Sequence, residues 1–214
     1  MMGSLSLFCG TVFMGFFAIM NPIANTPIFL GLTTGMDARD SRRLALKATV
    51  LAFVIVLVFS VLGKAIFALF GISLPAFRIT GGALVFLVGF HLLQGRQSSM
   101  HSSSLAEDET DDDAILSIAV SPLATPILAG PGTIVTAMNF AASGSILHVV
   151  LTIVIFALMC FITYLFFVYG EKLVRALGKE AVAVITRMMG LILAVIGTQM
   201  LLQGIFDAVK FFSK

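Results

Sequence analysis

The sequence contains no tryptophan, only two tyrosines and two cysteines, and few charged residues, which make up 11% of its 214 positions. Soluble domains typically carry about 25% charged residues, so this scarcity excludes an ordinary soluble domain. Hydrophobic residues instead account for 59% of the chain, and the mean hydropathy is +1.08. This composition indicates a protein that crosses a lipid bilayer several times.

Other absences narrow the function. The basic residues are dispersed among apolar segments, so the net charge of +2 gives no indication of a nucleic-acid partner. Cys9 and Cys160 each lie within an apolar run, which is typical of small core residues and not of a disulfide or a metal pair. No Ser/His/Asp, His-Glu-x-x-His or clustered carboxylate arrangement falls at a plausible membrane depth, so we predict neither an enzyme nor a bound cofactor.

Six segments are apolar and long enough to cross a bilayer, which takes about 20 residues. They are residues 5–33, 46–70, 77–93, 114–140, 147–169 and 184–206. The only strongly polar stretch, rich in serine and then in aspartate and glutamate, separates the third from the fourth and is typical of a solvated linker. The predicted organisation is a first three-helix unit (1–95), an acidic linker (96–113) and a second three-helix unit (114–214).

The two units repeat each other. Residues 21–28 (NPIANTPI) return as residues 121–127 (SPLATPI), and a second set recurs in the same order at one constant offset: Arg78, Gly81 and residues 92–95 match Arg187, Gly190 and residues 201–204. Because three helices is an odd number, the second unit must enter the membrane from the opposite side. We therefore predict an all-α membrane protein of six transmembrane helices, built as two inverted three-helix repeats with helices 1 and 4 broken at their proline motifs.

Basic residues favour one orientation. The connections after helices 1, 3 and 5 hold most of the lysines and arginines: Arg39, Arg42, Arg43, Lys47, Arg96, Lys172, Arg175 and Lys179. Positive charge concentrates in cytoplasmic loops. These three connections are thus predicted to be cytoplasmic, and both termini periplasmic.

The proline motifs predict a binding site within the membrane. Thr26 and Thr125 suit the N-cap of a half-helix, and Pro27 and Pro126 suit its first position, where unpaired N–H groups attract a carboxylate. The residues before Pro22 and Pro122 are displaced from helical geometry, which frees carbonyls for an ammonium group or Na⁺. A further break at residues 130–132 leaves open whether helix 4 restarts at Pro126 or Pro131. The candidate substrate-binding set is Asn21, Pro22, Asn25, Thr26, Pro27, Ser121, Pro122, Thr125, Pro126, Gly130 and Thr133.

Two alternatives apply to these residues. The prolines are also compatible with mechanical kinks whose backbone groups neighbouring helices satisfy. Arg78 and Arg187 occupy equivalent helix starts, where arginine more often anchors a helix or caps a carbonyl than binds substrate, so we assign them as gate or structural anchor. No acidic residue falls in the middle of a predicted span, which disfavours a carboxylate proton relay; coupling to Na⁺, coupling to H⁺ and no coupling stay open.

The combined motifs resemble the MarC/SnatA family of six-helix inner-membrane proteins. The resemblance rests on residues 21–30, 77–82, 128–134 and 187–191 and extends over essentially the whole chain. It implies a transporter of small neutral amino acids such as glycine or alanine in the bacterial inner membrane. The competing class is a non-transporting adaptor or sensor whose prolines are kinks. The sequence does not indicate the exact substrate, the direction of transport or the oligomeric state.

Overall fold

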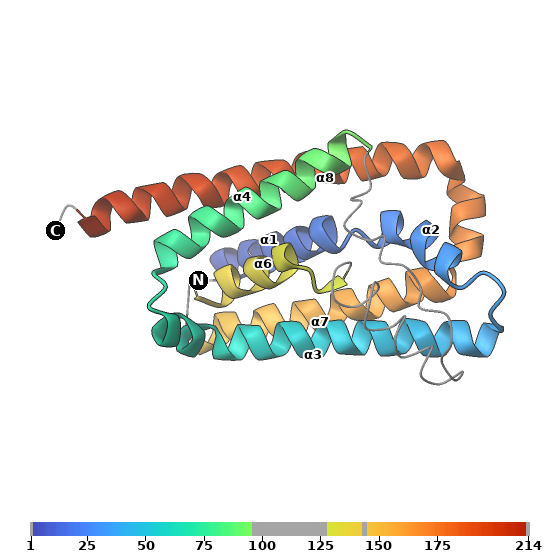
Figure 1. The fold of residues 1–214 in the computed structure, drawn as a ribbon, viewed down its shortest axis with the longest axis horizontal. Helices are drawn as coiled ribbons and strands as arrows, with labels where there is room; N and C mark the ends of the chain where they lie inside the picture. The colour runs from blue at the N-terminus through green and yellow to red at the C-terminus, as the bar shows by residue number, and fades with distance from the viewer. Residues whose placement is uncertain (1, 96–127, 143–144, 213–214) are drawn as a thin grey trace.

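The computed structural model describes residues 2–95, 128–142 and 145–212, and these residues form helices and connections without a strand. The helices are α1 (Met2–Met20), α2 (Pro22–Leu32), α3 (Ala38–Phe70), α4 (Leu74–Leu93), α6 (Pro131–Ala142), α7 (Ile146–Val168) and α8 (Gly170–Phe212). Most of them run along one long axis of the molecule (Figure 1). The all-α prediction is therefore confirmed for the described part of the chain.

The helices form three layers (Figure 1). The α4–α8 pair lies along one side, the α3–α7 pair lies along the opposite side, and α1, α2 and α6 occupy the space between them. The largest fully buried side chains come from this middle region and the helices that face it, among them Phe16, Phe29 and Phe156. The middle layer, which contains both proline-rich segments, is thus the part most shielded from the surroundings.

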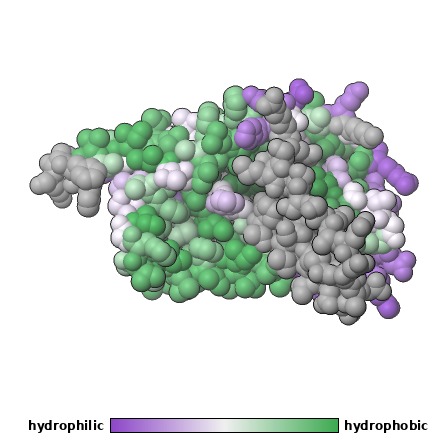
Figure 2. Space-filling view, viewed as in Figure 1, coloured by the Kyte–Doolittle hydropathy of each residue, from purple (hydrophilic) through white to green (hydrophobic). Residues whose placement is uncertain are grey.

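Five helical stretches of the described residues are long and apolar enough to cross a membrane. They are Leu5–Leu32, Ala38–Gly63, Leu74–Leu93, Ile146–Val168 and Glu180–Lys210. They agree with five of the six predicted spans, whereas the first part of the predicted span 114–140 lies outside the described residues. Many of their large apolar side chains are exposed, and the space-filling view is hydrophobic over most of the visible face (Figure 2). Such a surface is suited to contact with lipid.

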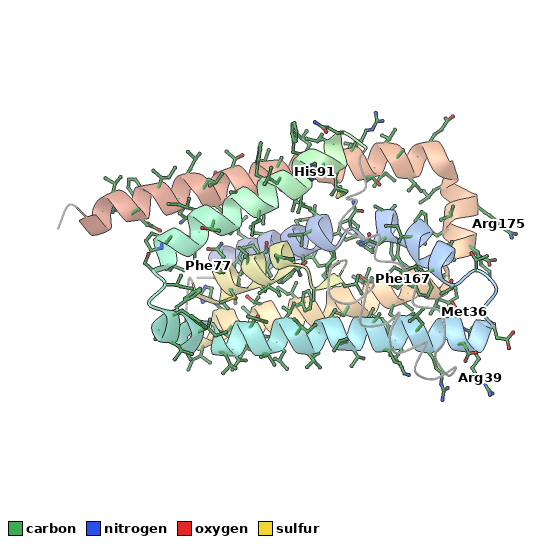
Figure 3. All side chains as sticks on the ribbon, in the orientation of Figure 1. Met36, Arg39, Phe77, His91, Phe167 and Arg175 are labelled. Atoms are coloured by element: carbon green, nitrogen blue, oxygen red, sulfur yellow. The ribbon has the colours of Figure 1, made fainter. Side chains whose placement is uncertain are left out.

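Charged side chains gather at one end of the bundle. Hydrophilic residues concentrate where α2 turns into α3 and where α8 begins (Figure 2), and Arg39 and Arg175 both lie at that end (Figure 3). The start of α1 and the end of α8 lie at the opposite end (Figure 1). This arrangement is the one that the distribution of basic residues predicts. The sidedness of the protein in a real membrane stays a prediction.

The start of α8 differs from the expected loop. Instead of a connection before a span at 184–206, the chain re-enters helix at Gly170, directly after α7, and turns at Gly178. Gly178 has φ 77° and ψ 157°, a conformation that favours glycine because a Cβ would clash with the backbone. Before this turn α8 lies across the end of the bundle, and after it α8 runs along α4 (Figure 1).

Glycines allow α4 and α8 to pack at unusually short range. A Cβ built on Gly82 would lie 2.7 Å from the carbonyl oxygen of Gly197, and one built on Gly89 would lie 2.4 Å from the amide nitrogen of Ala194. The relation is reciprocal, because a Cβ on Gly190 would lie 2.8 Å from the Gly89 carbonyl oxygen. Small residues at helix contacts are typical of membrane proteins, where close backbone approach drives association. We call these four glycines the glycine seam.

Candidate functional site

The first apolar span is interrupted at Asn21. Here α1 ends at Met20 and α2 begins at Pro22, while Asn21 has φ 37° and ψ 66°, the only positive φ of a non-glycine residue among those described. Asparagine tolerates this left-handed region better than most residues. Proline at the first helical position loses no intrahelical hydrogen bond. The predicted break of helix 1 at its proline motif is confirmed.

Side chains of the motif satisfy part of the interrupted backbone. The Asn21 Oδ1 accepts a hydrogen bond of 3.2 Å from the Ala24 amide, and the Asn25 Nδ2 donates one of 2.6 Å to the Met20 carbonyl. Thr26 Oγ1 donates one of 2.7 Å to the Pro22 carbonyl. Because unpaired backbone groups are costly in a membrane interior, these short polar residues stabilise the break itself.

The position of the restart corrects the expectation for Thr26 and Pro27. Thr26 is not an N-cap and Pro27 is not a first helical residue, because both lie inside α2 and Asn21 is the N-cap. Asn21 can adopt the left-handed conformation and also cap an amide, so the helix restarts at the earlier proline. Thr26 is fully buried, and its methyl group lies against Gly170, where an added Cβ would be 2.7 Å away.

A second helix start faces this break. Among the described residues of the fourth predicted span, α6 begins at Pro131, and the Gly130 carbonyl accepts a 3.1 Å hydrogen bond from the Ile134 amide. A Cβ built on Gly132 would lie 2.9 Å from Cδ1 of Ile19. The first turn of α6 therefore packs against the last turn of α1, next to Asn21. Pro131 is one of the two restart positions that the sequence left open; the other, Pro126, lies outside the described residues with Ser121, Pro122 and Thr125.

Two buried polar groups in this region have no hydrogen-bond partner among the described residues. They are the Asn21 Nδ2 and the Thr136 Oγ1, and each of these residues is 2% exposed. Thr136 lies on α6 and faces α1, since its methyl carbon would be 3.9 Å from a Cβ built on Gly15. Thr133, one turn earlier, is also 2% exposed. An unpaired buried donor is costly, so these groups are suited to a ligand or to water.

Arg78 lies at the end of the bundle where α1 starts. It is 8% exposed; its Nε donates a 2.8 Å hydrogen bond to Asn139 Oδ1, and its guanidinium forms an ion pair with Asp207. These contacts join α4, α6 and α8. The buried cation is therefore paired within the bundle, and its role as gate or anchor stays a prediction. Sequence reasoning did not pair Arg78 with Asn139 or Asp207, although opposite charges on one side of a bilayer are a usable signal.

Arg187 lies at the opposite end of the α4–α8 pair. It is exposed, and a Cβ built on Gly95 would lie 3.4 Å from its guanidinium. Gly204 has the matching relation to Arg78, because its added Cβ would lie 3.0 Å from the Arg78 Cβ. Arg78 of the first repeat therefore contacts Gly204, and Arg187 of the second repeat contacts Gly95. These two glycines end the matching segments 92–95 and 201–204.

The described residues contain no group of three or more histidines, cysteines, aspartates or glutamates that could hold a metal ion. What the site offers is backbone carbonyls, helix starts, hydroxyls and amides. Such groups bind a compact polar solute by hydrogen bonds, and they offer no nucleophile paired with a base.

Apolar helices that leave large hydrophobic side chains exposed, with a polar helix break in the middle layer, define an integral membrane protein. The model of the MarC family of integral membrane proteins matches residues 6–209, and the chain belongs to this family. It is 42% identical to the membrane protein YvbG of Bacillus subtilis over 91% of this chain and 94% of that protein. It is 32% identical to the inner membrane protein MarC of Escherichia coli, covering 90% and 91% of the two chains. No solved structure matches.

Proposed function

We propose that the protein is a secondary transporter of small neutral amino acids that works by alternating access around the two helix breaks. The observation that carries this proposal is the packing of the α6 start against the end of α1, beside the buried Asn21 Nδ2, which has no hydrogen-bond partner among the described residues. Discontinuous helices near the middle of the bilayer are the usual binding elements of transporters with inverted repeats. A break within the span Leu5–Leu32 supports a substrate site at this position.

The packing supports two inverted repeats of three helices each. In the first repeat the half-helix after the break, α2, packs against α7 and α8; in the second, α6 packs against α3 and α4. The equivalents of α3 and α4 in an inverted repeat are α7 and α8, so the two half-helices make matching contacts. The reciprocal approach of Gly204 to Arg78 and of Gly95 to Arg187 follows the same symmetry.

The chemistry of the site favours a zwitterion. The Asn21 Nδ2 is a donor and suits a carboxylate, and the start of α6 adds the positive end of a helix dipole. The Thr136 hydroxyl donates or accepts, and it is suited to either end of the solute. The close contact between Gly132 and Ile19 leaves room only for a compact solute. Of the predicted binding residues, Asn25 and Thr26 use their side chains to bond backbone carbonyls at the break.

Arg78, Asn139 and Asp207, which we call the Arg78 cluster, are suited to a gate at the end where α1 starts. The cluster joins α4 and α8 to α6, the helix that begins at the proposed site, and it contains the ion pair with Asp207. Breaking and remaking the hydrogen bond between Arg78 and Asn139 would couple movement of α6 to access from this side. Na⁺ and H⁺ are both compatible with the site as coupling ions, and so is uncoupled transport.

The proposal is tested by reconstituting the purified protein in proteoliposomes and measuring uptake of labelled glycine and alanine. Imposed Na⁺ and proton gradients, applied separately, identify the coupling ion. Saturable uptake above that of protein-free vesicles supports a transporter. The adaptor or sensor class is favoured by the hydrogen bonds with which the break satisfies its own backbone, and absence of uptake under every gradient would select that class.

The inverted architecture and its orientation have a separate test. A reporter fused after Lys214 should indicate the periplasm, and one inserted in residues 97–113 should indicate the cytoplasm. The reverse pattern would overturn the orientation and leave the repeat intact. Two reporters on the same side would contradict the odd number of spans in each repeat.

A further inference from the structure

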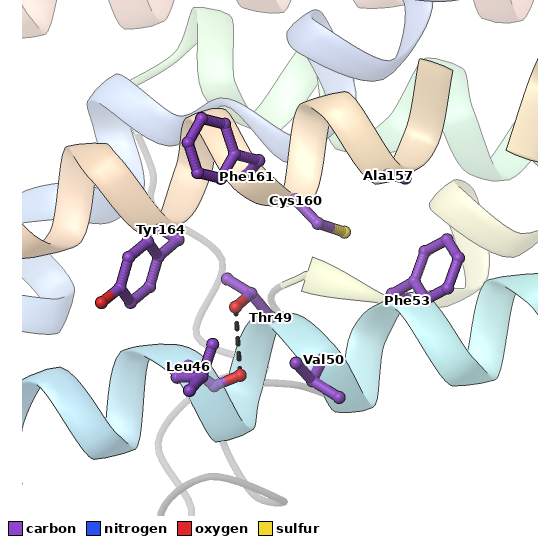
Figure 4. Close-up of a pocket in the computed structure, with 8 residues that line it drawn as sticks. All are labelled: Leu46, Thr49, Val50, Phe53, Ala157, Cys160, Phe161 and Tyr164. Carbon is purple, nitrogen blue, oxygen red and sulfur yellow. Dashed lines mark hydrogen bonds between the residues drawn. The ribbon is translucent and has the colours of Figure 1, made fainter. Parts of the chain in front are cut away.

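A groove on the surface of the α3–α7 pair is separate from the proposed transport site. Its central part is a cavity of about 350 Å³ between the two helices (Figure 4). The lining is almost entirely apolar and comprises Leu46, Thr49, Val50, Phe53, Ala157, Cys160, Phe161 and Tyr164. The hydroxyl that α3 contributes to this lining, that of Thr49, is already bonded to the backbone of its own helix.

The groove continues to the basic end of the bundle. A second cavity of about 370 Å³ is lined by Ala38, Arg39, Arg42, Arg43, Leu46 and Tyr164. Leu46 and Tyr164 line both cavities, so the two cavities form one groove. The first cavity is its apolar part, and the second, with three arginines, is its basic end. Tyr164 stands at the same edge of the lined region as Leu46, and its hydroxyl points away from Cys160 and Phe53 (Figure 4).

The groove opens to the outside of the bundle. Leu46 and Val50 are each 51% exposed on one wall, and Phe161 is 58% exposed on the other. Within a bilayer, these walls face acyl chains. The three arginines follow one another within the first turns of α3, where the chain leaves the membrane. A phospholipid whose tail occupies the apolar part would place its headgroup beside them.

We propose that this groove binds an anionic phospholipid, with one acyl chain against Val50, Phe53 and Phe161 and the headgroup phosphate at Arg39 and Arg42. The argument is charge complementarity. A guanidinium presents paired donors that match phosphate oxygens, and basic pockets between helices at a membrane surface are suited to anionic lipid headgroups. A zwitterionic lipid carries a compensating cation, which this arginine-lined end disfavours.

Two other occupants are tested against this one. The chain's own acidic residues between 107 and 113 are an alternative counter-charge for the arginines. A second copy of the protein is an alternative cover for the apolar walls. Neither alternative predicts a preference for one lipid headgroup over another, so headgroup dependence separates them from the proposal.

The experiment measures binding of phosphatidylglycerol and of phosphatidylcholine to the purified full chain in detergent by native mass spectrometry, at equal lipid concentrations. We expect phosphatidylglycerol to bind at least tenfold more tightly. The double variant Arg39→Gln/Arg42→Gln should lose this preference, whereas Arg39→Lys/Arg42→Lys should keep most of it. The matched control is Arg175→Gln, an exposed arginine at the same end that lies outside the groove, and it should bind both lipids like the parent.

A second variant tests the acyl-chain part without changing charge. Ala157→Trp fills the central cavity and should weaken phosphatidylglycerol binding severalfold, with an unchanged melting temperature in lipid-free detergent as the check on folding. Equal affinity of the parent for the two lipids would overturn the proposal. So would unaltered phosphatidylglycerol binding by Arg39→Gln/Arg42→Gln, because the arginines would then hold the acidic segment or nothing.

Discussion

The α4–α8 pair and the α1–α2–α6 region differ in how their backbones are packed: the first is closely packed, and the second is interrupted. Along the glycine seam, backbones approach so closely that even a methyl group has no space. At Asn21 the helix is interrupted, the backbone is partly satisfied by side chains, and one amide donor stays unpaired among the described residues. One region fixes the distance between two helices, and the other leaves polar groups in the middle layer. The contrast supports the proposal that the first is a scaffold and the second binds a solute.

The largest expected effect is on the scaffold. In Gly197→Ala the added Cβ would lie 2.3 Å from the Phe86 amide nitrogen, and backbone cannot move aside as a side chain does. Overpacking costs about 1 to 3 kcal/mol, and we expect the upper end of that range in the free energy of unfolding, measured in detergent. Gly10→Ala is the control, since nothing lies within 4 Å of its added Cβ. Equal stability of the two variants would show that the seam is not tightly packed.

The ion pair at the end of the seam should have the next largest effect. Asp207→Ala leaves the guanidinium of Arg78, which is 8% exposed, without its counter-charge. Breaking a fully buried pair costs about 3 to 5 kcal/mol; because the Asp207 side chain is 32% exposed, we expect a smaller loss of about 2 kcal/mol.

The control for Asp207→Ala is Glu171→Ala, which removes an exposed pair with Arg175 at 3.8 Å and should leave the melting temperature unchanged. Arg78→Lys keeps the charge but loses the planar fork, and as a gate it should alter the transport rate more than the affinity. A change in affinity alone would place Arg78 in the binding site.

Substitutions at the break should affect binding more than folding. Asn25→Leu removes the donor to the Met20 carbonyl and adds apolar bulk beside the site, and Thr125→Leu is the corresponding change in the second repeat. In the structure Asn25 bonds the Met20 carbonyl, so the leucine acts by disturbing the break and by filling space beside it. The affinity for glycine or alanine should fall by about tenfold or more, at least about 1.4 kcal/mol, as measured by calorimetry. Ser103→Leu, in the linker, should bind like the parent.

The smallest effect is expected in the acidic linker. Shortening the chain between Ser98 and Asp111 removes a polar stretch that has no counterpart in the first repeat. Loop length alters stability only weakly, so membrane insertion and transport rate should stay within error of the parent. Lost transport with normal insertion would give the linker a part in gating and would contradict the expectation that transport does not need it.

Hydrophobic patterning was enough to predict the five spans that the structure describes, because the bilayer imposes length and apolarity on each helix. The break before Pro22 was predictable for a different reason: a proline inside a helix loses a backbone hydrogen bond. The choice between Pro22 and Pro27 was not, since it depends on whether Asn21 or Thr26 caps the new helix, and only Asn21 adopts a left-handed conformation. The predicted residues of the second motif lie outside the described residues, so that half of the site stays a prediction.

Contacts between helices were the part of the structure that the sequence predicted least. Of the four glycines in the seam, the repeat spacing marked only Gly190. The partners of Gly82, Gly89 and Gly197 are set by the register of two antiparallel helices. Thr136 drew no attention as a site residue, because a threonine on a helix usually bonds its own backbone, as Thr49 does. Only the folded chain reveals that its hydroxyl has no partner within the described residues.

The proposal that the Asn21 break holds the solute is tested most directly by Asn21→Asp. This substitution keeps an oxygen to cap the Ala24 amide and replaces the Nδ2 donor, which has no partner among the described residues, with an acceptor that repels a carboxylate. Calorimetric titration of the purified parent and variant with glycine and alanine should give binding to the parent and affinity at least tenfold weaker in the variant, with both proteins folded. Equal affinities in parent and variant would contradict the claim and make the break a structural kink.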